Sequence, residues 1–99
     1  MPRLIITAGA VAGLDRCRQF LADRGARDPQ GVFEAKDVID DAFDRLREGM
    51  ATTRPDADPA CRILVIPFRR AGYLAQVRFD QVDDVVYVTA FRHQLEQGF

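Results

Sequence analysis

The chain has 99 residues, of which 47% are hydrophobic and 29% are charged. This length suits a single domain, residues 1–99, because smaller pieces could not bury a core, and the composition is typical of a folded globular protein. Fourteen basic and fifteen acidic residues give a net charge of −1. That balance argues against a strong nucleic-acid binder, which needs excess basic groups to neutralise phosphates.

The sequence gives no sign of export, a disulfide or a metal. No apolar run approaches the roughly 20 residues that cross a bilayer, and residues 1–7 do not resemble a signal peptide, so we expect a cytoplasmic protein. Cys17 and Cys61 are then expected to be free thiols or small core residues. They form no C-x-x-C pair and His93 is the only histidine, so we expect no metal and no other cofactor.

The N-terminal part predicts a short strand followed by a helix. Residues 3–7 are β-prone and of edge-strand length. The hydroxyl of Thr7 can cap a helix that follows it. Apolar residues then recur at helical spacing on one face, at Ala10, Leu14, Cys17 and Leu21. Gly25, within the segment 24–27, predicts the end of this helix.

A second amphipathic helix is predicted to begin at Asp28-Pro29. Aspartate is a good capping residue, and proline fits the first helical turn. One face of this helix is apolar, with Val32, Ala35, Ile39, Ala42, Phe43 and Leu46. The opposite face is acidic. Because the connection between the two helices is short, we expect an antiparallel helical hairpin.

The remaining residues predict a long loop and three strands. Residues 47–60 contain glycine, prolines and aspartates, which are typical of a loop. Strands are predicted at 62–67, 73–79 and 85–91, joined by turns at 68–72 and 80–84. The fold class is therefore α+β, in the order β-α-α-β-β-β, with the helical hairpin packed on one face of a small antiparallel sheet.

This order and the C-terminal residues resemble the RelE/ParE superfamily of toxins from type II toxin–antitoxin modules. ParE-like toxins commonly end in a β-branched strand and a pattern close to R-H-x-R-E-x-G-[YF]. Here Arg92, His93, Glu96, Gly98 and Phe99 fit this pattern, while Leu95 replaces a frequent arginine. The strand pair at 62–67 and 73–80 is similar to the central hairpin of the family, in which an arginine opens the first strand.

The resemblance implies a toxin that arrests growth by binding and inhibiting DNA gyrase, with no catalytic residues of its own. It also implies a hetero-oligomeric complex with a ParD-like antitoxin, without sequence-specific DNA binding by this chain. The expected target-binding residues are Arg69, Arg70, Arg92, His93 and Phe99. The expected antitoxin-binding residues are Leu14, Leu21, Phe43 and Leu46, because an antitoxin segment that folds on binding would bury apolar surface along the helical hairpin and the sheet.

Two alternatives remain open. A RelE-like member would be a ribosome-dependent mRNA endoribonuclease, with Arg62, Arg78 and Arg92 supplying charge and His93 supplying acid or base. Against it, the only lysine is Lys36 in the second helix, and a phenyl ring at the C-terminal position 99 cannot donate a proton. The second alternative is a relic that binds an antitoxin but has lost toxicity.

Overall fold

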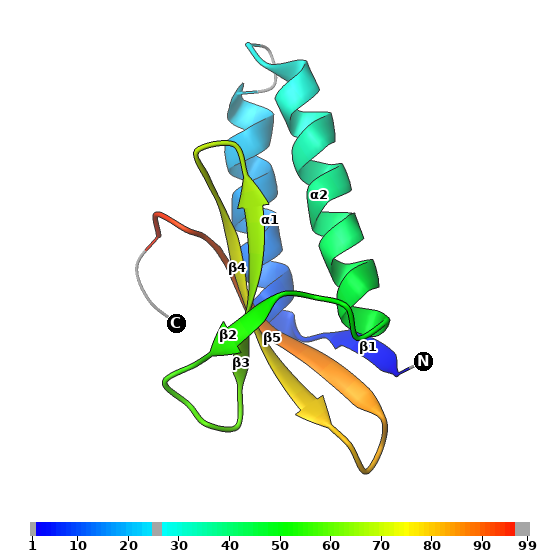
Figure 1. Ribbon diagram of the computed structural model, residues 1–99. Helices are drawn as coiled ribbons and strands as arrows, with labels where there is room; N and C mark the ends of the chain where they lie inside the picture. The colour runs from blue at the N-terminus through cyan, green and yellow to red at the C-terminus, as the bar shows by residue number, and fades with distance from the viewer. Residues whose placement is uncertain (1, 25–26, 97–99) are drawn as a thin grey trace.

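A computed structural model describes residues 2–24 and 27–96. Two helices, α1 (Ala8–Arg24) and α2 (Pro29–Arg47), follow a first strand, β1 (Arg3–Ile6). The other strands are β2 (Thr53–Pro55), β3 (Arg62–Phe68), β4 (Ala71–Asp80) and β5 (Val85–His93). Both helices lie side by side on one face of the sheet (Figure 1). The predicted α+β class is confirmed.

The sheet differs from the prediction in two respects. It has five strands in the order β1-β5-β4-β3-β2, because part of the expected loop at 47–60 forms the edge strand β2. It is also mixed and not purely antiparallel, because β1 pairs with β5 in parallel, Leu4 opposite Val86. The predicted meander of β3, β4 and β5 is confirmed, with Leu64 opposite Ala75 and Ala75 opposite Phe91.

Both helices start where their capping residues predict. The Thr7 hydroxyl accepts the Ala10 N–H at 3.4 Å and donates to the Val88 carbonyl at 3.0 Å, so it joins the start of α1 to β5. The Asp28 carboxylate accepts the Gly31 N–H at 3.0 Å and caps α2. Gly49, with φ of +75°, follows the end of α2 and takes a left-handed conformation that suits glycine. The predicted stop at Gly25 lies outside the described residues.

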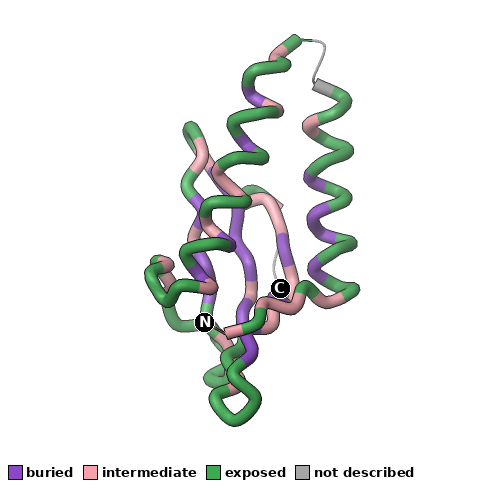
Figure 2. The backbone as a smooth tube through the Cα atoms, turned by 90° about the vertical axis from the view of Figure 1, so that its right-hand side faces the viewer, coloured by how far each residue is buried: buried purple, intermediate pink, exposed green. Residues whose placement is uncertain are grey.

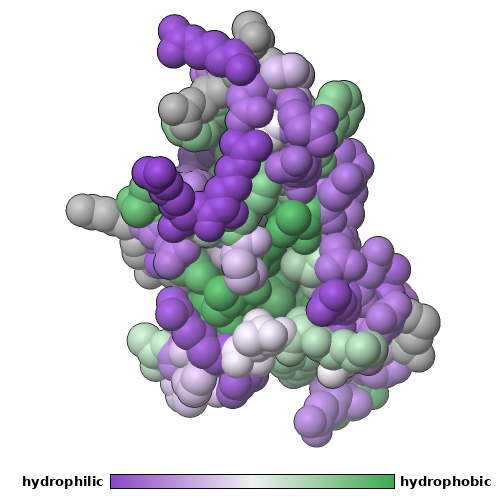
Figure 3. Space-filling view, turned by 45° about the horizontal axis from the view of Figure 1, so that its top comes forward, coloured by the Kyte–Doolittle hydropathy of each residue, from purple (hydrophilic) through white to green (hydrophobic). Residues whose placement is uncertain are grey.

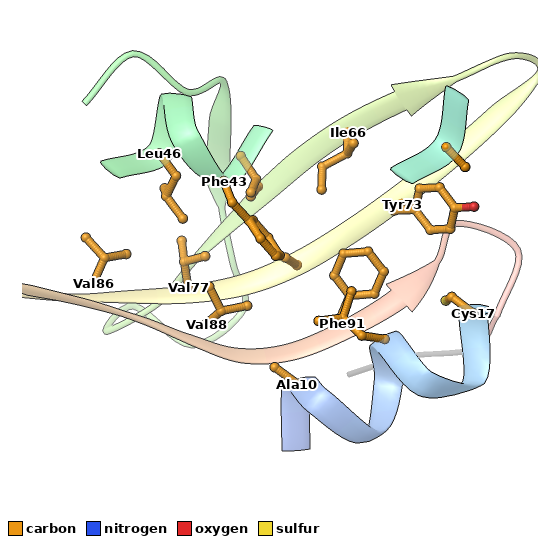
Figure 4. Packing of buried hydrophobic residues seen from close by; sticks show 14 residues of the cluster. Ala10, Cys17, Phe43, Leu46, Ile66, Tyr73, Val77, Val86, Val88 and Phe91 are labelled. Carbon is orange, nitrogen blue, oxygen red and sulfur yellow. The ribbon is translucent and has the colours of Figure 1, made fainter. Parts of the chain in front are cut away.

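The core lies between the helices and the sheet (Figures 2 and 4). Phe91 is 2% exposed and packs edge-on against Phe43 of α2, with ring centroids 6.1 Å apart. On its other side it stacks with Tyr73, at 5.5 Å. Leu46 and Val77 belong to the same cluster. The apolar faces predicted for both helices therefore meet the sheet, whereas the outer helix faces are exposed.

Among residues 2–24 and 27–96, neither helix is long and apolar enough to cross a membrane.

Candidate functional site

The end of β5 places His93 within a group of aromatic rings. His93 lies opposite Tyr73 on β4, and the two rings are perpendicular with centroids 5.5 Å apart. Phe20 of α1 approaches the other side of His93 at 6.5 Å. Phe68, at the end of β3, stacks on Tyr73 at 6.2 Å. Burial raises the pKa of the Tyr73 phenol. Three strands and α1 therefore bring four rings together at one end of the sheet.

The residues after β5 form a turn that His93 and Arg92 hold together. The Glu96 N–H donates to the His93 carbonyl at 3.0 Å, and the Leu95 N–H donates to His93 Nδ1 at 3.1 Å. The Arg92 guanidinium donates to the carbonyls of His93, Gln94 and Glu96. Both residues of the Arg-His pair thus shape the main chain.

Glu96 connects this turn to α1. Its carboxylate accepts from Arg16 at 3.2 Å, from the Cys17 thiol at 3.8 Å and from the His93 N–H at 3.3 Å. Burial, with a further contribution from the Glu96 charge, raises the pKa of the Cys17 thiol from 9.0 to about 11. At neutral pH Cys17 is therefore protonated and is a poor nucleophile.

The β3–β4 turn contributes two arginines that differ in their contacts. Arg69 has a left-handed backbone, with φ of +54°, and its side chain pairs with Asp28 at 2.5 Å and Glu34 at 3.4 Å. These ion pairs connect the turn to the first turns of α2. Arg70 is exposed and makes no ion pair with any described residue. Of the two arginines in this turn that are expected to contact a target, Arg70 is the one without an ion pair to a described residue.

A cleft runs between these groups, and we call it the His93 cleft. Phe20, Tyr73, His93 and Leu95 line its centre. A hollow of about 460 Å³ extends from this centre to Arg16, Cys17 and Glu96. A second hollow, of about 560 Å³, extends to Asp28 and the β3–β4 turn. Figure 3 shows the molecule with the top of Figure 1 turned forward, and on that face apolar side chains lie between hydrophilic ones.

The three arginines expected for a nuclease do not converge on His93. Arg62 lies opposite the core residue Val77, and therefore on the helix-bearing face of the sheet, where it donates to Thr53. Arg78 follows Val77 and lies on the other face, over the ring of Tyr87 at 4.7 Å. Arg92 also lies on that other face, opposite Leu74, which is about 13 Å along the strand from Arg78.

The four residues expected to bind an antitoxin are mostly buried. Leu14, Phe43 and Leu46 are 6%, 8% and 2% exposed, because they face the sheet and form part of the core. They are therefore not a free surface in this structure. Leu21 is half-buried and lines a groove of about 180 Å³ between the helices. This groove, which Val32 and Ile39 also line, is thus an accessible apolar surface of the hairpin.

Phe99, the last expected target-binding residue, lies outside the described residues. Within the ranges 2–24 and 27–96, no group of three or more histidine, cysteine, aspartate or glutamate side chains could hold a metal ion.

Sequence reasoning did not identify the aromatic cleft. No predicted site includes Phe20, and Leu95 stands there only as a departure from the family pattern. A usable signal was present, since Phe20 and Leu95 are large apolar residues at positions where a solvated face or tail would carry polar ones. Tyr73 could not be distinguished from an ordinary strand residue.

No family model matches the chain, and neither a curated protein nor a solved structure matches it.

Proposed function

We propose that this protein is the ParE-like toxin of a type II toxin–antitoxin module and that it inhibits DNA gyrase by binding to it. The proposal begins from the resemblance of residues 85–99 to the ParE-like C-terminal pattern. The observation that carries it is the use of Arg92 and His93. Arg92 holds the main chain of the C-terminal turn, and Nδ1 of His93 accepts a main-chain N–H. By holding the C-terminal turn in one conformation, Arg92 and His93 shape a surface that a protein target can contact.

The arrangement of charge favours binding over RNA cleavage. Cleavage through a 2′-hydroxyl needs a base, an acid and positive charge around one phosphate. Here Arg62 and Arg78 lie on opposite faces of the sheet, and the Arg92 guanidinium donates to carbonyls of its own turn. The net charge of −1 also suits a protein target better than ribosomal RNA. The RelE-like fold variant with nuclease activity is therefore the second choice.

We further propose a ParD-like antitoxin as the partner that keeps the toxin inactive. The groove between α1 and α2 supports this part of the proposal, because it exposes apolar side chains that include Leu21 and Ile39. Such a groove suits the apolar face of a partner helix. In this arrangement the antitoxin contacts Leu21 and its neighbours in the groove, whereas Phe43 and Leu46 stay in the core.

The test measures two possible activities of the purified protein, inhibition of gyrase and cleavage of ribosome-bound mRNA. Supercoiling of relaxed plasmid by gyrase should be inhibited in proportion to bound protein, because a binding inhibitor acts stoichiometrically. Relaxation of supercoiled plasmid by a type I topoisomerase serves as the control and should be unaffected. Codon-specific cuts in ribosome-bound mRNA with gyrase unaffected would overturn the proposal in favour of the endoribonuclease. If neither activity is altered and strong expression leaves growth normal, the chain is an antitoxin-binding relic.

A further inference from the structure

We propose that the His93 cleft binds a segment of a partner protein that presents one large apolar side chain flanked by carboxylates. This ligand chemistry follows from the cleft itself and is independent of the gyrase assignment. The centre of the cleft supplies the apolar contact, and the arginines around it supply the charge.

The apolar contact rests on two exposed side chains that share one hollow. Leu95 is 81% exposed and Phe20 is 55% exposed, and both border the cleft above Tyr73 and His93. Single exposed apolar residues are common on protein surfaces, but two that border one hollow are typical of a recognition site. The hollow of about 460 Å³ is large enough for an aromatic or leucine side chain. Such a side chain would bury Leu95 and Phe20 together.

The preference for carboxylates rests on an excess of arginine around the cleft. Among the described residues that line it, the basic groups are Arg16, Arg27, Arg69 and Arg70, and the acidic groups are Asp28 and Glu96. Both acidic groups are already paired, Asp28 with Arg69 and Glu96 with Arg16. Arg70 thus faces the cleft without a paired acid among the described residues. A guanidinium beside an apolar hollow favours a carboxylate through charge-assisted hydrogen bonds.

Two other occupants fit the cleft less well. A nucleic acid would bring several phosphates close to the acidic residues at the start of α2, where Glu34 already adjoins Arg69. A second copy of the chain could insert Phe33, which is 67% exposed on α2 beside Glu34. Such a contact would close into a dimer only if Phe33 and the cleft of each copy met around one two-fold axis, and would otherwise form rings or open chains. A separate partner segment needs no such assembly.

The experiment selects a displayed library of random twelve-residue peptides on the purified protein. We expect the enriched peptides to share an aromatic residue or leucine flanked by aspartate or glutamate. Their affinity should fall at least about tenfold for Leu95→Asp and for Arg70→Glu, since each change removes a central contact. Both residues are exposed, so neither change disturbs the core.

Matched controls change the same residue types elsewhere. Phe33→Asp alters another exposed apolar residue and Arg45→Glu another exposed arginine, and neither of these two α2 residues lines the cleft. These variants should bind the peptides as the wild type does. The proposal is overturned if no peptides are enriched, if the enriched ones lack carboxylates, or if the cleft variants and the control variants bind equally.

Sedimentation velocity of the wild type, of Leu95→Asp and of Phe33→Asp separates the partner segment from a second copy. The wild type should remain monomeric over the concentrations used for binding. Self-association that Leu95→Asp and Phe33→Asp both abolish would assign the cleft to another copy of the chain and overturn the proposal. Gyrase inhibition is measured separately, so its absence would remove the toxin assignment without affecting peptide binding.

Discussion

The Cys17 side chain is enclosed between α1 and the C-terminal turn, with 5% of its surface exposed. A thiolate at this position would be poorly solvated and would lie beside the Glu96 carboxylate. Both effects favour the neutral thiol, burial more than charge, and they raise the pKa of Cys17 to about 11. The raised pKa of Cys17 therefore makes the stability of the protein depend on pH.

We predict that the protein loses stability between pH 9 and about 11 as Cys17 titrates. In this range the unfolded thiol has lost its proton while the folded thiol keeps it, so the folded state binds more protons. Stability is then fully present below pH 9 and falls as pH rises, by up to about 1.4 kcal/mol per pH unit. Urea unfolding at several alkaline pH values measures this slope.

Cys17→Ala should remove most of this pH dependence of the free energy of unfolding. A residual slope of the same sign is expected, because burial also raises the pKa of Tyr73. Cys61→Ala is the matched control, since Cys61 lies in a loop away from the cleft, and it should largely keep the wild-type slope. Equal slopes for wild type and Cys17→Ala would contradict the assignment to Cys17.

Individual residues also show the limit of what the sequence could predict about the site. Arg92 and His93 were identified by pattern, and their position at the end of a strand is confirmed. The carbonyls that Arg92 reaches depend on a turn of the main chain that no spacing encodes. From the sequence alone, Arg62 and Arg78 could lie on the same face of the sheet. The register with Val77 separates them, and that register depends on pairing between distant segments.

Among the elements, α1 packs unusually close to β5. A Cβ added to Gly13 would lie 1.9 Å from the carbonyl oxygen of Phe91. Glycine at this position allows the helix backbone to contact the strand directly. Ala10 and Cys17 flank the contact with small side chains. This close approach also brings Phe20 within reach of His93, so it helps to form the cleft.

Gly13→Ala should therefore destabilise the protein even though alanine favours a helix. The added methyl must push α1 away from β5, which typically costs about 1–3 kcal/mol, against roughly 1 kcal/mol gained in helix propensity. We expect a net loss of up to about 2 kcal/mol in urea unfolding. Gly9→Ala is the matched control, because its Cβ would lie 3.0 Å from the Thr89 carbonyl, and it should cost less. An equal or more stable Gly13→Ala would show that the helix has room to move.

The predictability of the elements depended on how local their signals were. Each helix and each strand of the meander has its own hydrophobic periodicity, and each helix has its own capping residue, so all five could be predicted. The structure confirms them. β2 has three residues and ends in Pro55, a residue typical of loops, and it is a strand only because β3 lies beside it. The parallel pairing of β1 could not be predicted, because its partner β5 lies at the other end of the chain.

On the scale of the whole molecule, protection should decrease from the centre of the sheet to its edges. β5 and β4 lie inside the sheet, and on the helix-bearing face α1 packs on β5 while α2 packs on β3 (Figure 1). Ala75, Val77 and Val88 are 0% exposed. At one edge, β2 has exposed residues and a short ladder to β3. The free energy of local opening is lowest where few apolar contacts must be broken.

Hydrogen exchange followed by NMR should therefore find the slowest amides in β4 and β5, with rates that report global unfolding. Amides of β2 and of residues 56–61 should exchange through local opening and show little dependence on denaturant. Gly13→Ala should accelerate the slowest amides, since it weakens the contact between α1 and β5, and should leave the β2 amides unchanged. If instead β2 is protected as strongly as β4, the sheet opens as one unit and the edge is stabilised by contacts beyond its short ladder.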